Sequence, residues 1–157
     1  MSKFRFGPMA FCVGAIAVSS SAQADIDACT LLTASQVGAA VGTAVSGGQH
    51  VTETFIKTCT WTASAAGIKA VTLNIQAAAA FDGGKRAAQQ AAVLSRSAAA
   101  PSAGVGEDSF YLATGDQVSL FVKKGSNSFK VAVYATLPVD KKKSMELAIA
   151  RQVLAKL

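Results

Sequence analysis

Cysteine is the residue type in this chain with the most direct chemical potential. The sequence has three cysteines, of which Cys29 and Cys59 lie outside the apolar amino-terminal stretch that contains Cys12. In an oxidising compartment an even pair of cysteines predicts a disulfide. Closing a loop of about 31 residues stabilises the fold by roughly 3.7 kcal/mol in the chain-entropy model. The alternative is a redox pair. The C-x-x-C spacing typical of redox sites is absent, so we expect a structural disulfide.

The single histidine, His50, follows Gly47-Gly48, and this context favours an exposed loop residue. A catalytic base needs a nucleophile and an orienting partner, and neither is evident in the sequence. One histidine and a bonded cysteine pair also leave few ligands for a zinc site. We therefore predict no catalytic residue, no metal site and no cofactor.

Two charged motifs have both a functional and a structural interpretation. The segment GVGEDS, residues 104–109, offers Glu107 and Asp108 for a cation or its glycines for a phosphate. It lacks the lysine and helix of a P-loop and the oxygen spacing of a calcium loop, so we expect a loop that leads into a strand. The lysine run 141–143 could contact anionic lipid or glycan, but a solvated helix start is the expected role.

The first 24 residues have the pattern of a secretory signal. Lys3 and Arg5 precede the apolar run Met9–Val18, and an A-x-A triplet ends at Ala24. Spanning a bilayer takes roughly 20 apolar residues, about twice this run, so a membrane anchor is disfavoured. A lipid-modified Cys12 is disfavoured because this cysteine lies inside the apolar run and follows Phe11, where a lipoprotein signal has small residues. We expect cleavage after Ala24, with residues 25–157 forming a single periplasmic or secreted domain.

Loss of the leader's two basic residues lowers the formal net charge from +6 to +4. A mildly basic domain attracts anionic envelope polymers weakly, and its charge is too diffuse to argue for nucleic acid. No later segment approaches membrane-spanning length.

Periodicity predicts the elements that must position these residues. A helix over 30–43 would begin at Thr33 with a capping box to Gln36 and would end at Gly42. An irregular edge strand follows within 43–55. Alternating residues then predict strands over 57–64 and 69–77, joined through Ala65-Ala66-Gly67.

The second half of the sequence repeats this order. The alanine-rich segment 78–95 predicts a helix, although Gly83-Gly84 could delay its start to Lys85. Its expected inward residues are Phe81, Ala88, Ala92 and Val93. Strands are expected over 108–113, 117–125 and 128–137, and Gly125-Ser126-Asn127 makes a hairpin turn. A terminal helix over 140–157 would be capped by Asp140.

The fold class is therefore α+β, in the order α-βββ-α-βββ-α. We expect one twisted antiparallel sheet with helices packed on one face and one disulfide. The opposite face would carry threonine, asparagine and glutamine from the strands at 57–64 and 69–77. If Phe121 pairs near Ala132 and Tyr134 near Ser119, the same face carries two aromatics. A solvated face is the plain interpretation. A ligand or partner surface that includes Phe121, Tyr134, Thr60 and Asn74 is the functional one.

Four segments carry a resemblance to a known family: DACTLLTASQVGAAVG, CTW, GVGEDSFY and VKKGSNSFKVAV. The chain resembles exported bacterial domains of unknown function found as envelope lipoproteins and as the extracellular sensor domains of mycobacterial serine/threonine kinases. The resemblance implies a disulfide from Cys29 to Cys59 that ties the first helix to the sheet, an envelope location and ligand sensing. The chain lacks a lipid-attachment cysteine at its expected mature start, and its 157 residues include no kinase domain. Anchoring and signalling are therefore not carried over.

These features predict a non-enzymatic domain that binds an envelope protein or a small envelope ligand. An envelope enzyme or inhibitor that uses His50 or Glu107 is the main alternative. A structural envelope component without a soluble ligand is a third.

Overall fold

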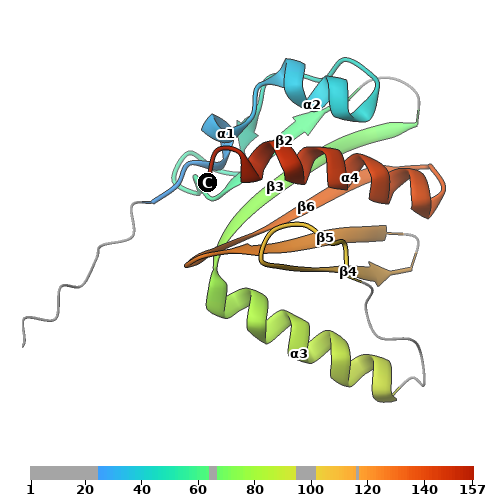
Figure 1. The fold of residues 1–157 in the computed structure, drawn as a ribbon. Coiled ribbons are helices and arrows are strands. Elements are labelled where there is room, and N and C mark those ends of the chain that lie inside the picture. The colour runs from blue at the N-terminus through green and yellow to red at the C-terminus, as the bar shows by residue number, and fades with distance from the viewer. Residues whose placement is uncertain (1–24, 64–66, 95–101, 116) are drawn as a thin grey trace, which may run out of the picture.

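The computed structural model describes residues 25–63, 67–94, 102–115 and 117–157. The expected leader, its cleavage point after Ala24, Cys12 and the connection at Ala65-Ala66 lie outside these residues. Helices α1 (Ala28–Leu31) and α2 (Ala34–Val41) precede the first three strands, α3 (Ala78–Leu94) separates these from the last three, and α4 (Val139–Leu154) follows them (Figure 1). The strands are β1 (Gln49–His50), β2 (Thr58–Thr62), β3 (Ile68–Ala77), β4 (Asp108–Thr114), β5 (Gln117–Lys124) and β6 (Asn127–Ala135).

The strands form one antiparallel sheet in the order β1-β2-β3-β6-β5-β4. Each half of the chain contributes three consecutive strands, and the two halves join where β3 pairs with β6. The predicted α+β class and the order of elements are confirmed. No helix among the residues placed in the structure is long and apolar enough to cross a membrane.

The inner face of the sheet carries the main core. Alternate residues of β3, β5 and β6 are fully buried there, together with the inward side of α4 and the short helices α1 and α2. These residues include Val71, Leu73, Leu120, Val122, Val131, Ile149 and Val153. Burial of aliphatic side chains at period two on the strands is the main force that holds these helices to the sheet.

Helix α3 packs on the other face, which differs from the prediction that all helices share one face (Figure 1). Phe110 and Phe121 are cross-strand partners that point away from the main core. Phe110 stacks on Phe121 at 4.8 Å between ring centroids, and Phe81 of α3 meets Phe110 edge-on at 5.2 Å. The sequence pattern predicted Phe121 and Tyr134 on this face but not Phe110. Phe110, from β4, links Phe121 to Phe81 and so connects α3 to the sheet.

The start of α3 also differs from expectation. The helix begins at Ala78, directly after β3, and runs through Gly83 and Gly84. Each glycine costs about 1 kcal/mol in helix propensity, but contacts with the sheet on both sides of the pair offset this cost. Phe81 is fully buried as predicted, whereas Val93 is 77% exposed and does not face inward.

The amino-terminal helical region was predicted in outline. Thr33 and Gln36 form the capping box of α2, and Gly42 ends it with φ of 74°. A break at Leu32 separates the single turn of α1 from α2. The disulfide between Cys29 and Cys59 is present with an S–S distance of 1.96 Å, and it ties α1 to β2. The edge strand is short and irregular, as expected: Val45 bridges to Ala63 before β1.

The N-cap of α4 lies two residues before the predicted one. Pro138 is its N-cap residue, and Asp140 lies in the first turn rather than at the cap. A proline at this point suits a helix start because a backbone N–H would have no intrahelical partner there. Asp140 still favours the helix dipole from its place in the first turn.

Candidate ligand-binding face

The outer face of β2, β3 and β6 forms a polar surface. Its cross-strand pairs include Thr60 with Thr72, Asn74 with Lys130, and Ala70 with Tyr134. We call the following residues the polar face: Thr58, Thr60, Thr62, Thr72, Asn74, Gln76, Lys130 and Tyr134. Tyr134 is 40% exposed and Thr62 is also exposed, while the others are half-buried. The polar face therefore presents hydroxyl and amide groups beside one accessible aromatic ring.

Hydrogen bonds fix part of the polar face. The Asn74 amide donates to Thr58 Oγ1 at 2.6 Å, and the Gln76 amide donates to Asn74 Oδ1 at 2.6 Å. At the other end the Thr62 hydroxyl donates to Ser46 Oγ at 2.9 Å. These side chains are held in place before any ligand arrives, which reduces the entropy cost of binding.

Phe121 belongs to the part of the outer face that α3 covers. It is half-buried under Phe110, which in turn is buried under Phe81. The sequence placed Phe121 and Tyr134 on one face, and the register agrees. Phe121 lies opposite Lys130, and Tyr134 lies four residues further along β6, an even spacing that keeps it on the same face. Of the four residues proposed from the sequence, Thr60, Asn74 and Tyr134 lie together, and Phe121 supports α3.

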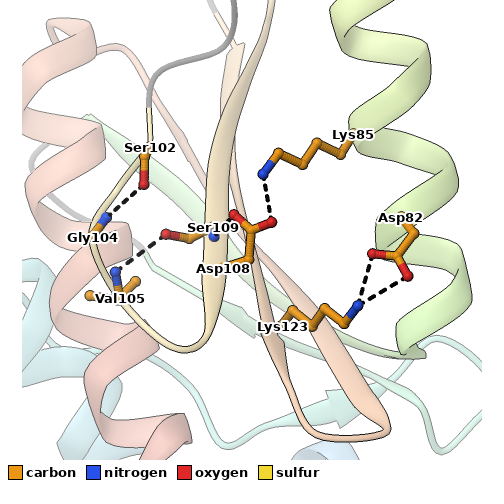
Figure 2. Close-up of polar contacts among 8 residues, drawn as sticks. All are labelled: Asp82, Lys85, Ser102, Gly104, Val105, Asp108, Ser109 and Lys123. Carbon is orange, nitrogen blue, oxygen red and sulfur yellow. Dashed lines mark hydrogen bonds and ion pairs between the residues drawn. The ribbon is translucent and has the colours of Figure 1, made fainter.

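Two ion pairs reinforce the contact of α3 with the sheet (Figure 2). Asp82 accepts from Lys123 Nζ at 2.9 and 3.0 Å, and Lys85 Nζ donates to Asp108 Oδ2 at 2.5 Å. The hydrogen bond from Lys85 is the main reason why the pKa of Asp108 lies below its usual range. Lys123 and Asp108 are cross-strand partners, so the four charges form a compact group at one end of β4 and β5.

The acids of segment 104–109 have structural partners. Besides Lys85, Asp108 accepts from the Ser109 backbone N–H at 2.8 Å, and Glu107 accepts from the Gly125 N–H at 2.9 Å. Ser109 Oγ accepts from the Val105 N–H at 3.3 Å (Figure 2). This segment is a loop that leads into β4, as predicted.

His50 is not the exposed loop residue that the sequence predicted. It lies in β1, and its Nε2 donates to Asp27 Oδ1 at 2.8 Å, with 27% of the side chain exposed. Asp27 is also the N-cap of α1 and accepts from the Cys29 N–H at 2.8 Å. The hydrogen bond from His50 lowers the pKa of Asp27. The sequence carried one signal for this pair. The expected Cys29–Cys59 disulfide brings Asp27, two residues before Cys29, close to the strand that pairs with β2.

The lysine run 141–143 is not a uniformly solvated start of α4. Lys142 is buried, and Lys143 Nζ lies 5.5 Å from the centre of the Tyr111 ring. Only Lys141 is fully directed to solvent, so a contact of the whole run with lipid or glycan is disfavoured.

Glu146 is a buried acid that the sequence analysis missed. Its side chain is fully buried between α4 and the sheet, where Oε1 accepts from the Val133 N–H at 3.1 Å and Oε2 has no described partner. Burial raises its pKa to about 8. Its spacing from Ile149, Ala150 and Val153 places it on the apolar face of the helix, which is the pattern that could have revealed it.

A small hollow of about 90 Å³ adjoins the polar face at Gln76. Its lining includes Asp25, Lys57 and Asn127, and Lys57 forms an ion pair with Asp25 at 3.0 Å. A hollow of this size holds a few water molecules or one small polar group of a larger ligand.

No family model, no curated protein and no solved structure matches the chain.

Proposed function

We propose that this chain is an exported, non-enzymatic domain that binds an envelope protein or a small envelope ligand through the polar face. The observation that carries the proposal is the division of the outer face into two parts. Helix α3 makes its ring contacts and ion pairs with β4 and β5. The polar face lies towards the other end of the strand order, where Tyr134 keeps 40% of its surface exposed.

The chemistry of the polar face suits recognition rather than catalysis. Binding sites combine apolar area with a few well-placed polar groups that orient the ligand. Tyr134 supplies the area, and the threonine hydroxyls with Asn74 and Gln76 supply donors and acceptors. Lys130 adds a positive charge, which favours an anionic or neutral ligand over a cationic one.

Export is supported by the disulfide, because disulfides persist in oxidising compartments. The proposed location is the periplasm or the extracellular space. A role in sensing, as in the lipoproteins and kinase sensor domains that the sequence resembles, is part of the same proposal.

An envelope enzyme or inhibitor is the second candidate, and the His50–Asp27 pair is the observation that favours it. In a hydrolase such a pair activates a nucleophile. Cys29 and Cys59 are joined to each other, and Glu107 holds the turn at Gly125. Substituting His50 and Glu107 together tests this candidate. An activity that persists unchanged in the double variant would remove it.

Thermal-shift screening tests the binding proposal directly. The screen uses peptidoglycan fragments and anionic phospholipid vesicles, with wild type, a Thr72→Ala/Tyr134→Ala variant and a Leu94→Ala control. Leu94 is 86% exposed on α3 and outside the polar face. A compound that raises the Tm of wild type and control should not raise that of the double variant. Equal shifts in all three proteins would place binding elsewhere.

A further inference from the structure

A cluster of potential metal ligands surrounds the disulfide. Asp27, Cys29 and His50 each offer one ligand atom, and these atoms all lie within 4.8 Å of one another. They come from the start of α1 and from the edge strand β1, which the disulfide holds together. All three residues are half-buried, so the cluster is partly screened from water but remains reachable.

Cys59 supplies a fourth ligand atom to the same place. His50 and Cys59 are direct partners in the β1–β2 ladder, and the Cα atoms of Cys29 and Cys59 are 5.0 Å apart. Two thiolates, an imidazole and a carboxylate form a ligand set suited to tetrahedral zinc. In such a site the ligand atoms lie about 3.3–3.8 Å apart. After the S–S bond of 1.96 Å breaks, the two sulfurs must therefore separate by about 2 Å, whereas the other ligand atoms need smaller shifts.

The surroundings of Cys59 also contain a buried hydrogen-bond donor that would favour a thiolate there. The Trp61 indole is fully buried, and its Nε1–H has no hydrogen-bond acceptor among the described residues. Nε1 and Cys59 Sγ both lie within 3 Å of the point that a Cβ on Gly48 would occupy. A thiolate at Cys59 is a better hydrogen-bond acceptor than a disulfide sulfur, so reduction would place a stronger acceptor in the neighbourhood of the unpaired indole.

We infer that reduction of the Cys29–Cys59 disulfide creates a zinc site formed by Cys29, Cys59, His50 and Asp27. A dithiol reductant supplies two electrons and two protons, breaks the S–S bond and is itself oxidised to a disulfide. Zn²⁺ then binds both sulfurs and displaces two protons from the thiols. The oxidised protein holds the fold with a covalent bond, and the reduced protein holds the same contact between α1 and the sheet with a metal ion.

Cobalt titration under anaerobic conditions tests this inference. Co²⁺ is added to protein reduced with a phosphine and to oxidised protein, and the visible absorption of tetrahedral thiolate-bound cobalt is followed. Reduced wild type should develop this band with one equivalent of Co²⁺ and lose it when Zn²⁺ is added. Oxidised protein should not develop it. Absence of the band in reduced wild type would overturn the inference.

Substitutions of the ligand residues distinguish the proposed site from nonspecific binding of Co²⁺ to free thiols. His50→Ala and Asp27→Asn should each weaken Co²⁺ binding at least tenfold, and Cys29→Ser/Cys59→Ser should abolish the band. Asp82→Asn is the matched control, because Asp82 pairs with Lys123 on the opposite face. Equal affinities in wild type and His50→Ala would contradict the proposed ligand set.

Reduction could also loosen the fold around the disulfide. The near-UV circular dichroism of the single tryptophan, Trp61, measures this loss of packing. Zn²⁺ should restore this signal in reduced wild type and should not do so in reduced His50→Ala. Failure of Zn²⁺ to restore a lost signal in the wild type would also count against the site.

Discussion

Burial changes the acid–base chemistry of Glu146 strongly. Burial raises its pKa from 4.5 to about 8 in the folded protein. The titratable groups that interact electrostatically with Glu146 are Tyr111 of β4 and Lys142 and Lys143 of α4. In the folded state the carboxyl group keeps its proton over a pH range in which the unfolded chain releases it. The contribution of Glu146 to stability is therefore full below pH 4.5 and is lost progressively as the pH rises through 8.

Glu146→Gln should remove most of this pH dependence. Each pKa unit corresponds to about 1.4 kcal/mol, so wild type should lose a few kcal/mol of unfolding free energy between pH 5 and 8 that the variant does not lose. Urea unfolding at several pH values measures the difference. Glu107→Gln is the control, because Glu107 is exposed, and it should follow wild type. Parallel curves for wild type and Glu146→Gln would show that Glu146 is not the responsible group.

The backbone of Gly48 lies close to the disulfide and to Trp61. A Cβ at this position would lie 2.6 Å from Cys59 Sγ and 2.9 Å from Trp61 Nε1, both of which are fully buried. Gly48→Ala should therefore destabilise the protein by about 1–3 kcal/mol through overpacking. Gly47→Ala is the matched control, since nothing lies within 4 Å of a Cβ there. A thermal melt in which both variants lose equal stability would contradict this account.

At the scale of elements, α3 is held to the sheet mainly by one aromatic anchor. Phe81 is fully buried against Phe110, whereas Val93 near the end of the same helix is 77% exposed. Phe81→Ala should cost about 3–5 kcal/mol of unfolding free energy, and Val93→Ala should change it by no more than about 0.5 kcal/mol. Denaturant unfolding compares the two. A similar small effect of both substitutions would mean that α3 is not docked through Phe81.

The elements were largely predictable because their signals are local. The capping box at Thr33 and Gln36 and the alternation along β3, β5 and β6 are visible within a few residues. The position of α3 was not, because it depends on Phe81 meeting Phe110, a residue far along the sequence that stacks on Phe121 of the next strand. The same limit hid the pairing of His50 with Asp27, which follows from the disulfide and the β1–β2 register.

At the scale of the whole molecule, the disulfide connects the amino-terminal helical region to the sheet. Its loop of about 31 residues corresponds to roughly 3.7 kcal/mol in the chain-entropy model. Cys29→Ser/Cys59→Ser, which avoids a single unpaired thiol, should lose about this much unfolding free energy while keeping the fold. Urea unfolding of the metal-free oxidised wild type and the double variant measures it. Equal unfolding midpoints would show that the bond contributes little to stability.

The polar face was predicted from sequence in composition but not in extent. Threonine, asparagine and glutamine at alternate positions indicated an outward polar surface, and the structure places them beside Tyr134. The boundary of this surface is set by α3, whose location required the complete fold. The molecule thus has its main buried core on one face of the sheet, and on the other face an area covered by α3 beside the polar face.

Site-specific photocrosslinking in living cells is the most direct test of binding through the polar face. A photoreactive phenylalanine analogue is placed at Tyr134 or at Leu94, both of which are exposed but on different surfaces. We expect a discrete, saturable crosslinked product from position 134 and none from position 94. A product from position 94 alone, or no product from position 134, would contradict the proposed binding surface.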